Sequence, residues 1–356
     1  MKGLILSGGK GTRLRPLTYT SAKQLVPVAN KPVLFFGIES IVRAGIEEIG
    51  IVVGETHQEI RAAVGDGSRF GARVTYIQQD APRGLAHAVL IARDFLGDDS
   101  FVMYLGDNLI ASGITELVEE FRRLGCNSEI LLAKVANPRQ FGVAELTADG
   151  KVHRLVEKPE QPKSDLALVG VYMFDHHIHE SVRRIQPSAR GELEITDAIQ
   201  DLVDRGLDVH PHVVKGWWKD TGKLEDMLEA NRIVLEKMES DWSSTALRGS
   251  SAIEGRVVLG EGAEVVDSVV RGPVIIGAGA RIINAFVGPY TSIGDRCEIS
   301  HCEIENSIVL ADSSILDVPR RIDGSLVGRN VRIVRAIEKP KAYRFMLGDN
   351  SEVGIV

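Results

Sequence analysis

The residues with the clearest chemistry lie in a glycine-rich loop that follows the first expected strand, 3–6. The loop reads Ser7-Gly8-Gly9-Lys10-Gly11-Thr12-Arg13-Leu14-Arg15. Glycines let backbone N–H groups approach phosphate oxygens closely, and a neighbouring arginine neutralises charge that develops as a phosphorus–oxygen bond breaks. Arg13 is such an arginine. The loop therefore suits a nucleoside triphosphate.

Two common phosphate-binding motifs do not fit this loop. In a Walker A motif a serine or threonine follows the lysine, whereas Lys10 is followed by Gly11. The dinucleotide fingerprint fails because Leu14 stands three residues after Gly11. A glycine-rich loop after a first strand is often only a turn, but Gly-Gly-x-Gly-Thr-Arg-Leu is a far more specific combination.

Two aspartates are candidate ligands of a metal ion. Asp107 ends the apolar run 101–105 just after Gly106, at the sheet edge where α/β folds bind ligands, and Asp220 follows Trp217-Trp218 in an expected turn. Mg²⁺ in phosphoryl chemistry is usually held by a few protein oxygens and completed by phosphate oxygens. The alternative for each aspartate is a cap or turn residue.

A series of motifs resembles the sugar-phosphate nucleotidylyltransferases over residues 1 to about 235. After 8–14, matches follow in chain order at 23–28, 30–32, 84–86, 105–108, 157–159, 190–197 and 218–222. Lys-Gln-Leu, Leu-Gly-Asp-Asn and Arg-Gly-Glu-Leu-Glu-Ile-Thr-Asp resemble in particular the glucose-1-phosphate thymidylyltransferases. The residues beyond 250 resemble the extension of the long form, which is found beside antibiotic and deoxysugar pathways.

The resemblance implies that the chain binds dTTP. It places Lys23 near the triphosphate or the sugar phosphate, whereas composition alone makes Lys23 a solvated loop residue. Gln79 and Gly84 would read the edge of the pyrimidine, although a bare turn explains them equally well without the match. The nucleotide-binding residues implied in this way are Leu6, Gly8, Gly9, Gly11, Thr12, Arg13, Gln79, Gly84 and Asp107.

The resemblance also implies a site for glucose 1-phosphate. Lys158 and Arg190 would hold its phosphate, Glu157 would accept hydrogen bonds from sugar hydroxyls, and Gly142 would offer backbone contacts. Without the match, Lys158 belongs to a loop and Arg190 merely precedes the helix expected near 192–204. The residues assigned to the sugar phosphate are Gly142, Glu157, Lys158, Arg190 and Trp218.

The expected reaction is an in-line displacement. An oxygen of glucose 1-phosphate attacks the α-phosphorus of dTTP, pyrophosphate leaves, and no covalent enzyme intermediate forms. Asp107 and Asp220 would hold the Mg²⁺ that bridges both substrates, and the expected catalytic residues are Arg13, Lys23 and Lys158. A phosphate oxygen is already anionic at neutral pH, so no general base is needed.

The elements that must position these residues follow an α/β pattern over residues 1–240. Short apolar runs predict strands at 3–6, 48–53, 74–78, 101–105, 128–134, 169–174 and 208–213. Apolar residues at steps of three and four predict helices at 34–44, 86–95, 114–124, 195–202 and 223–238. This alternation indicates a Rossmann-like, mostly parallel sheet with helices on its faces, the nucleotidyltransferase domain of the resemblance.

From about residue 253 the sequence changes to a repeat of 17 residues without a slip. An aliphatic residue followed by a small one recurs at Leu259-Gly260, Ile276-Gly277, Ile293-Gly294, Leu310-Ala311 and Val327-Gly328. The same register aligns Val265, Ile282, Ile299, Leu316 and Ile333. This spacing predicts a triangular β-helix of about five coils over 251–335, followed by a tail over 336–356. It resembles the hexapeptide repeat of left-handed parallel β-helices, which carries the expected handedness.

Composition limits the class of partner and the location. With 356 residues, about two domains are expected. The net charge of −7 disfavours a nucleic-acid partner, and the three cysteines lack the CxxC spacing of a zinc site. No apolar run is long enough to span a membrane or to act as a secretory core, so we expect a cytoplasmic protein. A flat-sided β-helix also favours a homo-oligomer.

Three alternatives stay open. UTP or another sugar phosphate could be the substrate, because a thymine methyl contributes only about 1 kcal/mol of apolar contact. The β-helix could carry acyltransferase activity through His301, although a solvent-facing histidine is the simpler interpretation. A sugar-nucleotide sensor without catalysis would have lost metal or phosphate residues, and Arg13, Lys23 and Asp107 are present.

Overall fold

We describe a computed structural model of the chain. The described residues are 1–9, 11–19, 21–110, 113–214, 216–242 and 246–335. Lys10 of the glycine-rich loop and the predicted tail 336–356 lie outside them. Among the helices that the structure describes, none combines the length and the apolar character needed to cross a bilayer.

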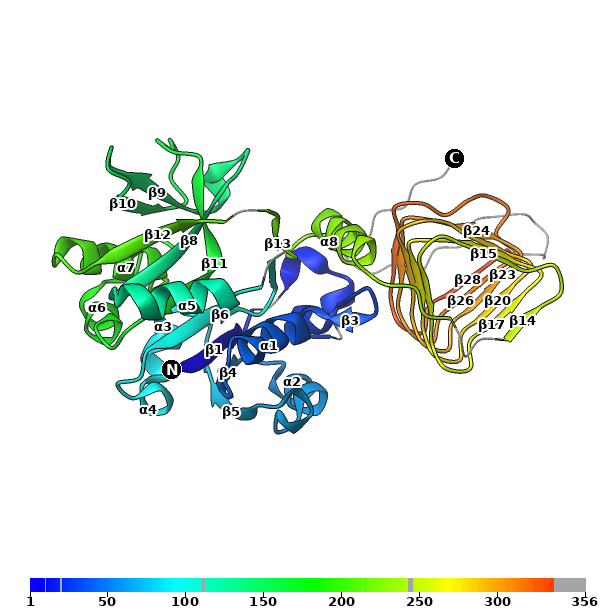
Figure 1. Ribbon diagram of the computed structural model, residues 1–356, viewed down its shortest axis with the longest axis horizontal. Helices are drawn as coiled ribbons and strands as arrows, with labels where there is room; N and C mark the ends of the chain where they lie inside the picture. Colours follow the sequence, from blue (N-terminus) through cyan, green and yellow to red (C-terminus); the bar gives the residue numbers. More distant parts are fainter. Residues whose placement is uncertain (10, 20, 111–112, 215, 243–245, 336–356) are drawn as a thin grey trace. The chain divides into compact units, whose positions relative to one another are not determined.

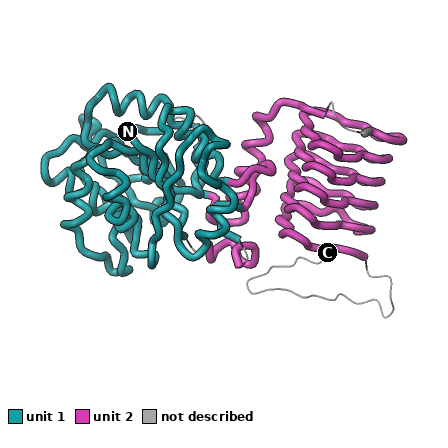
Figure 2. The backbone as a smooth tube through the Cα atoms, turned by 90° about the horizontal axis from the view of Figure 1, so that it is seen from below, with its two compact units in different colours: residues 1–10, 21–25, 33–220 teal, residues 11–20, 26–32, 221–356 magenta. Residues whose placement is uncertain are grey.

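The chain divides into two compact units (Figure 2). The first contains residues 1–10, 21–25 and 33–220, and the second contains 11–20, 26–32 and 221–356. The second unit thus includes two short segments from the N-terminal part of the chain. The domain limits of 1–240 and 251–335 stay a prediction.

A single sheet forms the centre of the first unit (Figure 1). Its strands are β1 (Lys2–Ser7), β4 (Glu48–Val53), β5 (Arg73–Gln78), β6 (Phe101–Leu105), β8 (Ser128–Lys134), β9 (Gly142–Leu146), β10 (Val152–Glu157), β11 (Leu166–Phe174) and β12 (Val209–Val213). All seven strands predicted from the sequence are present. β9 and β10 were not predicted.

The sheet is mixed, whereas the sequence predicts a mostly parallel one. β5, β4, β1 and β6 pair in parallel in that order, and β12 pairs in parallel with β8. β11 joins the two parts and runs antiparallel to both β6 and β8. No α-helix lies between β8 and β11 in the described chain, and a parallel pair needs such a crossover.

Helices cover both faces of this sheet, as predicted. They are α1 (Val33–Arg43), α2 (His57–Val64), α3 (Leu85–Ile91), α4 (Arg93–Leu96), α5 (Thr115–Leu124), α6 (Ile178–Arg184) and α7 (Ile195–Asp204). Because side chains alternate along a strand, Leu4 and Leu6 of β1 join one buried core, with α3, α6 and α7. Ile5 joins the other, with α1, α2 and α5. The single helix expected over 86–95 is divided between α3 and α4.

The second unit contains a parallel β-helix. One face consists of β14 (Ala246–Arg248), β17 (Glu264–Val266), β20 (Arg281–Ile283), β23 (Glu298–Ser300), β26 (Ser314–Leu316) and β28 (Arg332–Val334). The second consists of β15 (Ala252–Glu254), β18 (Val269–Arg271), β21 (Phe286–Val287) and β24 (Glu303–Ile304). The third consists of β16 (Val257–Leu259), β19 (Val274–Ile276), β22 (Thr291–Ile293), β25 (Ile308–Val309) and β27 (Leu326–Val327). Three faces agree with the predicted triangular section, and the left-handedness stays a prediction.

The repeat of the β-helix is not a constant 17 residues, and this part of the sequence interpretation is wrong. Ile299 pairs with Ile315, 16 residues later, and Ile315 pairs with Ile333, 18 residues later. Ile315 is fully buried, whereas Leu316, which the 17-residue register aligns inward, is only half-buried. A coil one residue short is followed by a coil one residue long, so the first and last coils still match the 17-residue count.

The remaining elements of the second unit pack against the β-helix. They include α8 (Leu224–Glu236) and the short antiparallel pair β2 (Pro27–Val28) and β3 (Lys31–Pro32). The Asn30 side chain donates a hydrogen bond to the backbone oxygen of Ile293, 2.7 Å away, in β22. The segment around β2 and β3 is therefore tied directly to a coil of the β-helix.

Candidate active site

A cavity of about 210 Å³ opens in the first unit at the carboxyl ends of β1 and β6. This edge of the parallel strands is where ligands bind in open α/β sheets. The structure brings together here seven of the predicted residues, from separate segments of the chain. They are Leu6, Gly8, Gly9, Lys23, Gln79, Gly84 and Asp107.

An ion pair between Lys23 and Asp107 lies in this cavity. Lys23 begins the short 3₁₀ helix η3 (Lys23–Leu25), and its ammonium group donates to Oδ2 of Asp107. Both side chains are largely buried, with 14% and 12% of their surface exposed. The pair places a cation and an anion side by side where the glycine-rich loop leaves β1.

The Asp107 carboxylate is stabilised in its charged form. Burial alone would raise its pKa, but the charge of Lys23 and hydrogen bonds from Lys23 and Asn108 outweigh burial, so the pKa lies below its ordinary value. Asn108 Nδ2 donates to Asp107 Oδ1 over 3.0 Å. Asp107 is therefore an anion at neutral pH, as a metal ligand must be.

Gly9 and Gln24 shape the same end of the cavity. A Cβ atom on Gly9 would stand 3.3 Å from Cε of Lys23, so a larger residue there would press on the ammonium-bearing chain. Gln24 is 1% exposed, and its Oε1 has no hydrogen-bond donor among the described residues. Gln24 lines the cavity but was not assigned to the site, although it belongs to the Lys-Gln-Leu motif.

Asp220 and Trp218 reach the site through Asn108. They lie in β13 (Trp218–Asp220), which pairs antiparallel with β7 (Asn108–Ile110), so that Asp220 stands opposite Asn108. Trp218 Nε1 donates to Asn108 Oδ1 over 2.5 Å. The buried Asn108 thus holds both Asp107 and Trp218, and sequence reasoning did not single it out as a site residue.

The donor set around Asp107 fits a hard divalent cation. Asp107 and Asp220 supply carboxylate oxygens from adjoining parts of two paired strands, which is the ligand type that Mg²⁺ prefers. In this structure the Lys23 ammonium provides the positive charge at Asp107. The two aspartates could therefore hold Mg²⁺, with the remaining ligands supplied by phosphate and water.

Gln79 lines the opposite wall and is held by a histidine that was not predicted. Its Nε2 lies 3.0 Å from Nδ1 of His87 in α3, and a Cβ atom on Gly8 would stand 3.0 Å from its Oε1. Burial, and then the charge of Arg83, lower the pKa of His87 below its ordinary value. A neutral His87 accepts from the amide and fixes the orientation of Gln79 as a group that can read a base.

Gly84 has a structural reason that is separate from any ligand. It precedes α3 with φ of +102°, and a Cβ atom there would collide with the backbone of Leu193. The backbone of Leu193 donates to Arg83 and accepts from Ala86, at 2.8 and 3.0 Å. Gly84 therefore permits a close approach that joins the cavity wall to the segment before α7.

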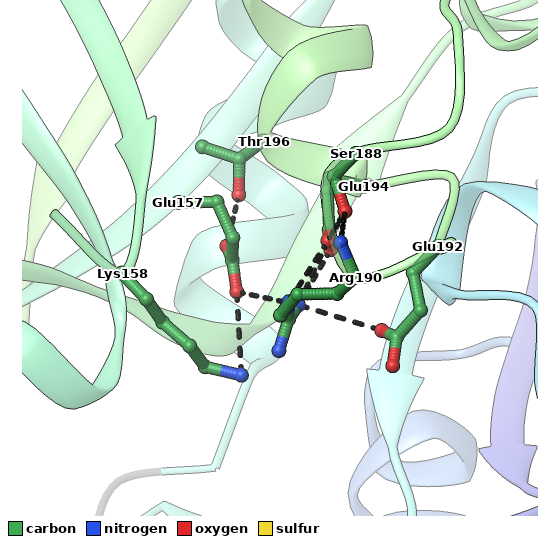
Figure 3. Close-up of polar contacts among 7 residues, drawn as sticks. All are labelled: Glu157, Lys158, Ser188, Arg190, Glu192, Glu194 and Thr196. Carbon is green, nitrogen blue, oxygen red and sulfur yellow. Dashed lines mark hydrogen bonds and ion pairs between the residues drawn. The ribbon is translucent and has the colours of Figure 1, made fainter.

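The residues predicted for the sugar phosphate form a second cluster (Figure 3). Arg190 Nη2 lies 3.3 Å from Glu157 Oε1 and 3.4 Å from Glu192 Oε2, and 2.8 Å from Glu194 Oε1. Lys158 Nζ lies 3.6 Å from the same oxygen of Glu157. Glu192 also lines the cavity, so this cluster adjoins it.

The backbone around this cluster is tightly constrained. Thr196 donates to Glu157 Oε2 over 2.6 Å, and a Cβ atom on Gly142 would stand 3.0 to 3.1 Å from both groups. Burial first, and then the charges of Glu194 and Glu157, raise the pKa of Asp197. The surroundings are thus strongly anionic, and Arg190 and Lys158 are the cations that could receive a phosphate there.

The remaining predicted residues lie in the second unit. Gly11 has φ of +62° and precedes the 3₁₀ helix η1 (Thr12–Leu14), in which Thr12 and Arg13 are exposed. Thr18 donates to the Gly11 carbonyl over 2.6 Å, which closes this loop on itself. The assignment of Gly11, Thr12 and Arg13 to the nucleotide stays a prediction.

Comparison with known proteins agrees with this geometry. The model of the nucleotidyl transferase family matches residues 2–237. A glucose-1-phosphate thymidylyltransferase of Streptomyces antibioticus is 58% identical over 356 residues, which cover 100% of this chain and 99% of that protein.

Two crystal structures are similar to the N-terminal two thirds of the chain. One, of a candidate glucose-1-phosphate thymidylyltransferase from Bacillus anthracis with sucrose, has a TM-score of 0.63 at 35% identity and covers 68% of this chain and 98% of that one. The other, a UDP-glucose pyrophosphorylase with UDP-glucose, has a TM-score of 0.61 at 26% identity and covers 67% and 99%.

The fold and the cavity define an α/β enzyme that handles phosphorylated nucleotides at the carboxyl edge of its sheet. With the family match over residues 2–237 and the full-length similarity, the chain belongs to the nucleotidyl transferase family.

Proposed function

We propose that this protein transfers a thymidylyl group from dTTP to glucose 1-phosphate, releasing pyrophosphate and forming dTDP-glucose. The observation that carries the proposal is the cavity in which the Lys23–Asp107 ion pair faces Gln79, next to the cluster around Arg190. The printed name of the Streptomyces relative, which is similar over its full length, supports these substrates.

The nucleotide would bind with its base at Gln79 and its phosphates at the Gly8-Gly9 loop. Asp107 and Asp220 would hold Mg²⁺, which when bound neutralises phosphate charge and aligns the substrates. Lys23 would then turn from Asp107 to the phosphates. A buried ammonium in a cavity stabilises developing negative charge more strongly than one in water.

The sugar phosphate would bind at the second cluster. Its phosphate would take Arg190 and Lys158 from their present carboxylate partners, and Glu157 would accept from sugar hydroxyls. Arg190 has a planar fork of donors that suits phosphate geometry. Attack by a phosphate oxygen on the α-phosphorus of dTTP then needs positioning and charge stabilisation alone.

The base is the least constrained part of the proposal. Uracil offers the same edge as thymine to Gln79, and the two differ by one methyl group, about 1 kcal/mol of apolar contact. A structure similar to this chain binds UDP-glucose. UTP is therefore the alternative nucleotide, and a deoxysugar or antibiotic pathway is the proposed destination of the product.

Other properties are proposals of lower reach. The cytoplasmic location and the homo-oligomer follow only from the sequence. His301 occupies a corner of the β-helix with φ of +52°, half exposed beside Ser300 and Asp317. Asn284 and Asp317 hold equivalent corners with similar φ, which favours a structural role for His301 over acyl transfer.

The decisive experiment measures pyrophosphate release with Mg²⁺ and glucose 1-phosphate, with dTTP, UTP, CTP, GTP or ATP supplied separately at limiting concentration. We expect the highest kcat/KM with dTTP. A higher value with UTP would overturn the assignment of the base. Absence of release with every nucleotide would overturn the assigned reaction, and binding of labelled dTDP-glucose would then distinguish a sensor from an enzyme for another sugar phosphate.

Lys23→Gln is the variant that tests the cavity. It removes the ammonium group but keeps a polar chain, and we expect kcat to fall with dTTP. Lys151→Gln is the matched control, because Lys151 is exposed with 80% of its side-chain surface accessible and follows a turn. Equal activity in both variants would remove Lys23 from the mechanism.

A further inference from the structure

A buried carboxylate lies far from the cavity, in the apolar core beneath α5. Glu129 of β8 is 0% exposed, and neither of its oxygens has a hydrogen-bond partner among the described residues. It stands in one row of the sheet with Met173 and Val102, both members of that core. Burial, and then the charge of Glu120, raise the pKa of Glu129 to about 8. Such a group normally has a partner.

Polar side chains from two other elements converge on Glu129. His212 of β12 has Nδ1 2.8 Å from Oε2 of Glu120 in α5 and 4.0 Å from Oε1 of Glu129. One ligand atom from each of these three residues lies within 4.8 Å of the others. His210, on the same strand, has Nε2 3.9 Å from Oε1 of Glu120.

We propose that Glu120, Glu129 and His212 bind a divalent transition-metal ion, Zn²⁺, at a site separate from the active site. Zinc takes imidazole nitrogen and carboxylate oxygen at roughly 2.0 to 2.2 Å, so tetrahedral ligands stand about 3.4 Å apart. The present separations of 2.8 and 4.0 Å lie on either side of that value. His210 or water would complete the coordination.

The donor set distinguishes this site from the one proposed for Mg²⁺. Mg²⁺ and Ca²⁺ prefer oxygen ligands only, whereas an imidazole favours zinc and its neighbours. The row through Glu129 crosses β6 at Val102, five residues before Asp107. At about 3.3 Å per residue the two sites are roughly 16 Å apart along the strand. The inference does not depend on the proposed reaction.

A bound ion would link three elements that now meet only through packing and one hydrogen bond. β12 forms the edge of its sheet and pairs with β8 alone, and α5 covers the core beside them. The ion would also satisfy the Glu129 carboxylate and replace the proton that joins His212 to Glu120. Arg123, 3.5 Å from Oε1 of Glu120, is exposed and can turn outward.

The experiment is equilibrium dialysis of chelator-treated full-length protein against micromolar Zn²⁺ in millimolar Mg²⁺, with the metal content measured by mass spectrometry. We expect one Zn²⁺ per chain, and at least a tenfold weaker affinity in both Glu129→Gln and His212→Gln. Saturating Zn²⁺, at about 100 times Kd, should raise Tm by about 5 °C in the wild type but not in Glu129→Gln.

A second cluster provides the matched control. His177 Nδ1 lies 2.8 Å from Asp175 Oδ2, and with His176 these residues could also attract a metal ion. His177→Gln should retain full Zn²⁺ binding. Loss of binding in His177→Gln with retention in Glu129→Gln would overturn the proposal, as would the absence of binding by the wild type at 100 µM Zn²⁺, a concentration far above that expected for a built site. Uptake of Co²⁺, followed by its visible absorption, gives an independent readout.

Discussion

The side-chain oxygen of Asn231 accepts a hydrogen bond from the backbone N–H of Ala29, 2.9 Å away and 202 residues earlier in the chain. The same oxygen accepts from Ser292 Oγ over 2.6 Å, and its amide donates to the Tyr290 carbonyl over 3.0 Å. Asn231 is fully buried. One side chain of α8 therefore joins the segment around β2 and β3 to a coil of the β-helix.

Removing this side chain should destabilise the second unit. Asn231→Ala leaves the buried Ala29 N–H and Tyr290 carbonyl without these partners, and unsatisfied buried groups of this kind cost about 1 to 3 kcal/mol each. We expect a loss of about 3 kcal/mol in the free energy of unfolding, measured by urea denaturation. Glu229→Ala, at an exposed position of the same helix, is the control. A loss below about 1 kcal/mol would contradict the role assigned to Asn231.

Asp107→Asn should lower activity without unfolding the protein. Asparagine keeps the shape and one acceptor for Lys23 but loses the charge that would hold Mg²⁺, and the side chain faces a cavity into which Lys23 can move. We expect kcat to fall about 100-fold or more, with a change in Tm of less than about 3 °C. The measurements are pyrophosphate release over a Mg²⁺ titration and a thermal melt.

The control for this substitution is Asp149→Asn. Asp149 is exposed in the turn between β9 and β10, where it accepts from Thr147 over 2.6 Å. It should keep the kcat of the wild type. Full activity in Asp107→Asn at every Mg²⁺ concentration would remove Asp107 from the metal site.

Arg190→Lys should affect the sugar phosphate rather than the nucleotide. The guanidinium reaches Glu157, Glu192 and Glu194 at once, and an ammonium cannot reproduce this fork. We expect KM for glucose 1-phosphate to rise about tenfold while KM for dTTP changes little. Initial rates over a matrix of both substrates separate the two constants.

Arg184→Lys is the matched control for that experiment. Arg184 is also a surface guanidinium with two carboxylate partners, Glu180 and Asp201, but it lies on α6 outside the cluster. Its substrate constants should equal those of the wild type. An equal rise in KM for dTTP in Arg190→Lys would show that Arg190 acts on the whole cavity and not on one substrate.

The strands that the sequence predicts best are those with continuous apolar runs. β4, β6 and β8 match the expected limits residue for residue, because buried strands are apolar on both faces. β10 was missed because it reads Val-His-Arg-Leu-Val-Glu and exposes His153 and Arg154. The antiparallel placement of β11 was also missed, since pairing direction depends on connections that periodicity does not report.

The predicted site follows the same division. Residues in short specific motifs, such as Gly8-Gly9 and Lys23, line the cavity as expected. His87 and Asn108 were not assigned, because each acts by holding another side chain, Gln79 or Asp107, across the fold. Such a role depends on partners in space, and the local sequence contains no record of them.

The shift in the β-helix repeat makes a paired test possible. Ile315 is fully buried in the aliphatic core, whereas Leu316 points away from it and is half-buried. Ile315→Ala should cost about 3 kcal/mol of unfolding free energy, and Leu316→Ala about 1 kcal/mol, measured by urea denaturation. A constant 17-residue repeat requires the opposite order, so the sign of the difference decides the register.

His179 should make the stability of the first unit depend on pH. It is 5% exposed in α6, with its ring stacked 6.0 Å from that of Phe101. Burial, and then the charge of Arg93, lower its pKa to about 4, below the ordinary value of 6.5. Between these two values the unfolded chain binds a proton that the folded chain does not, so stability present above pH 6.5 is lost as the pH falls toward 4.

The substitution His179→Leu should remove this dependence, because leucine cannot bind a proton and remains apolar against Phe101. From pH 7.5 to pH 4.5 the wild type should lose about 2 to 3 kcal/mol more unfolding free energy than the variant, measured by urea denaturation at each pH. His153→Leu, on exposed β10, should behave like the wild type. Equal losses in the wild type and His179→Leu would mean that His179 is as easily protonated in the folded chain as in the unfolded one, which its burial among apolar side chains does not allow.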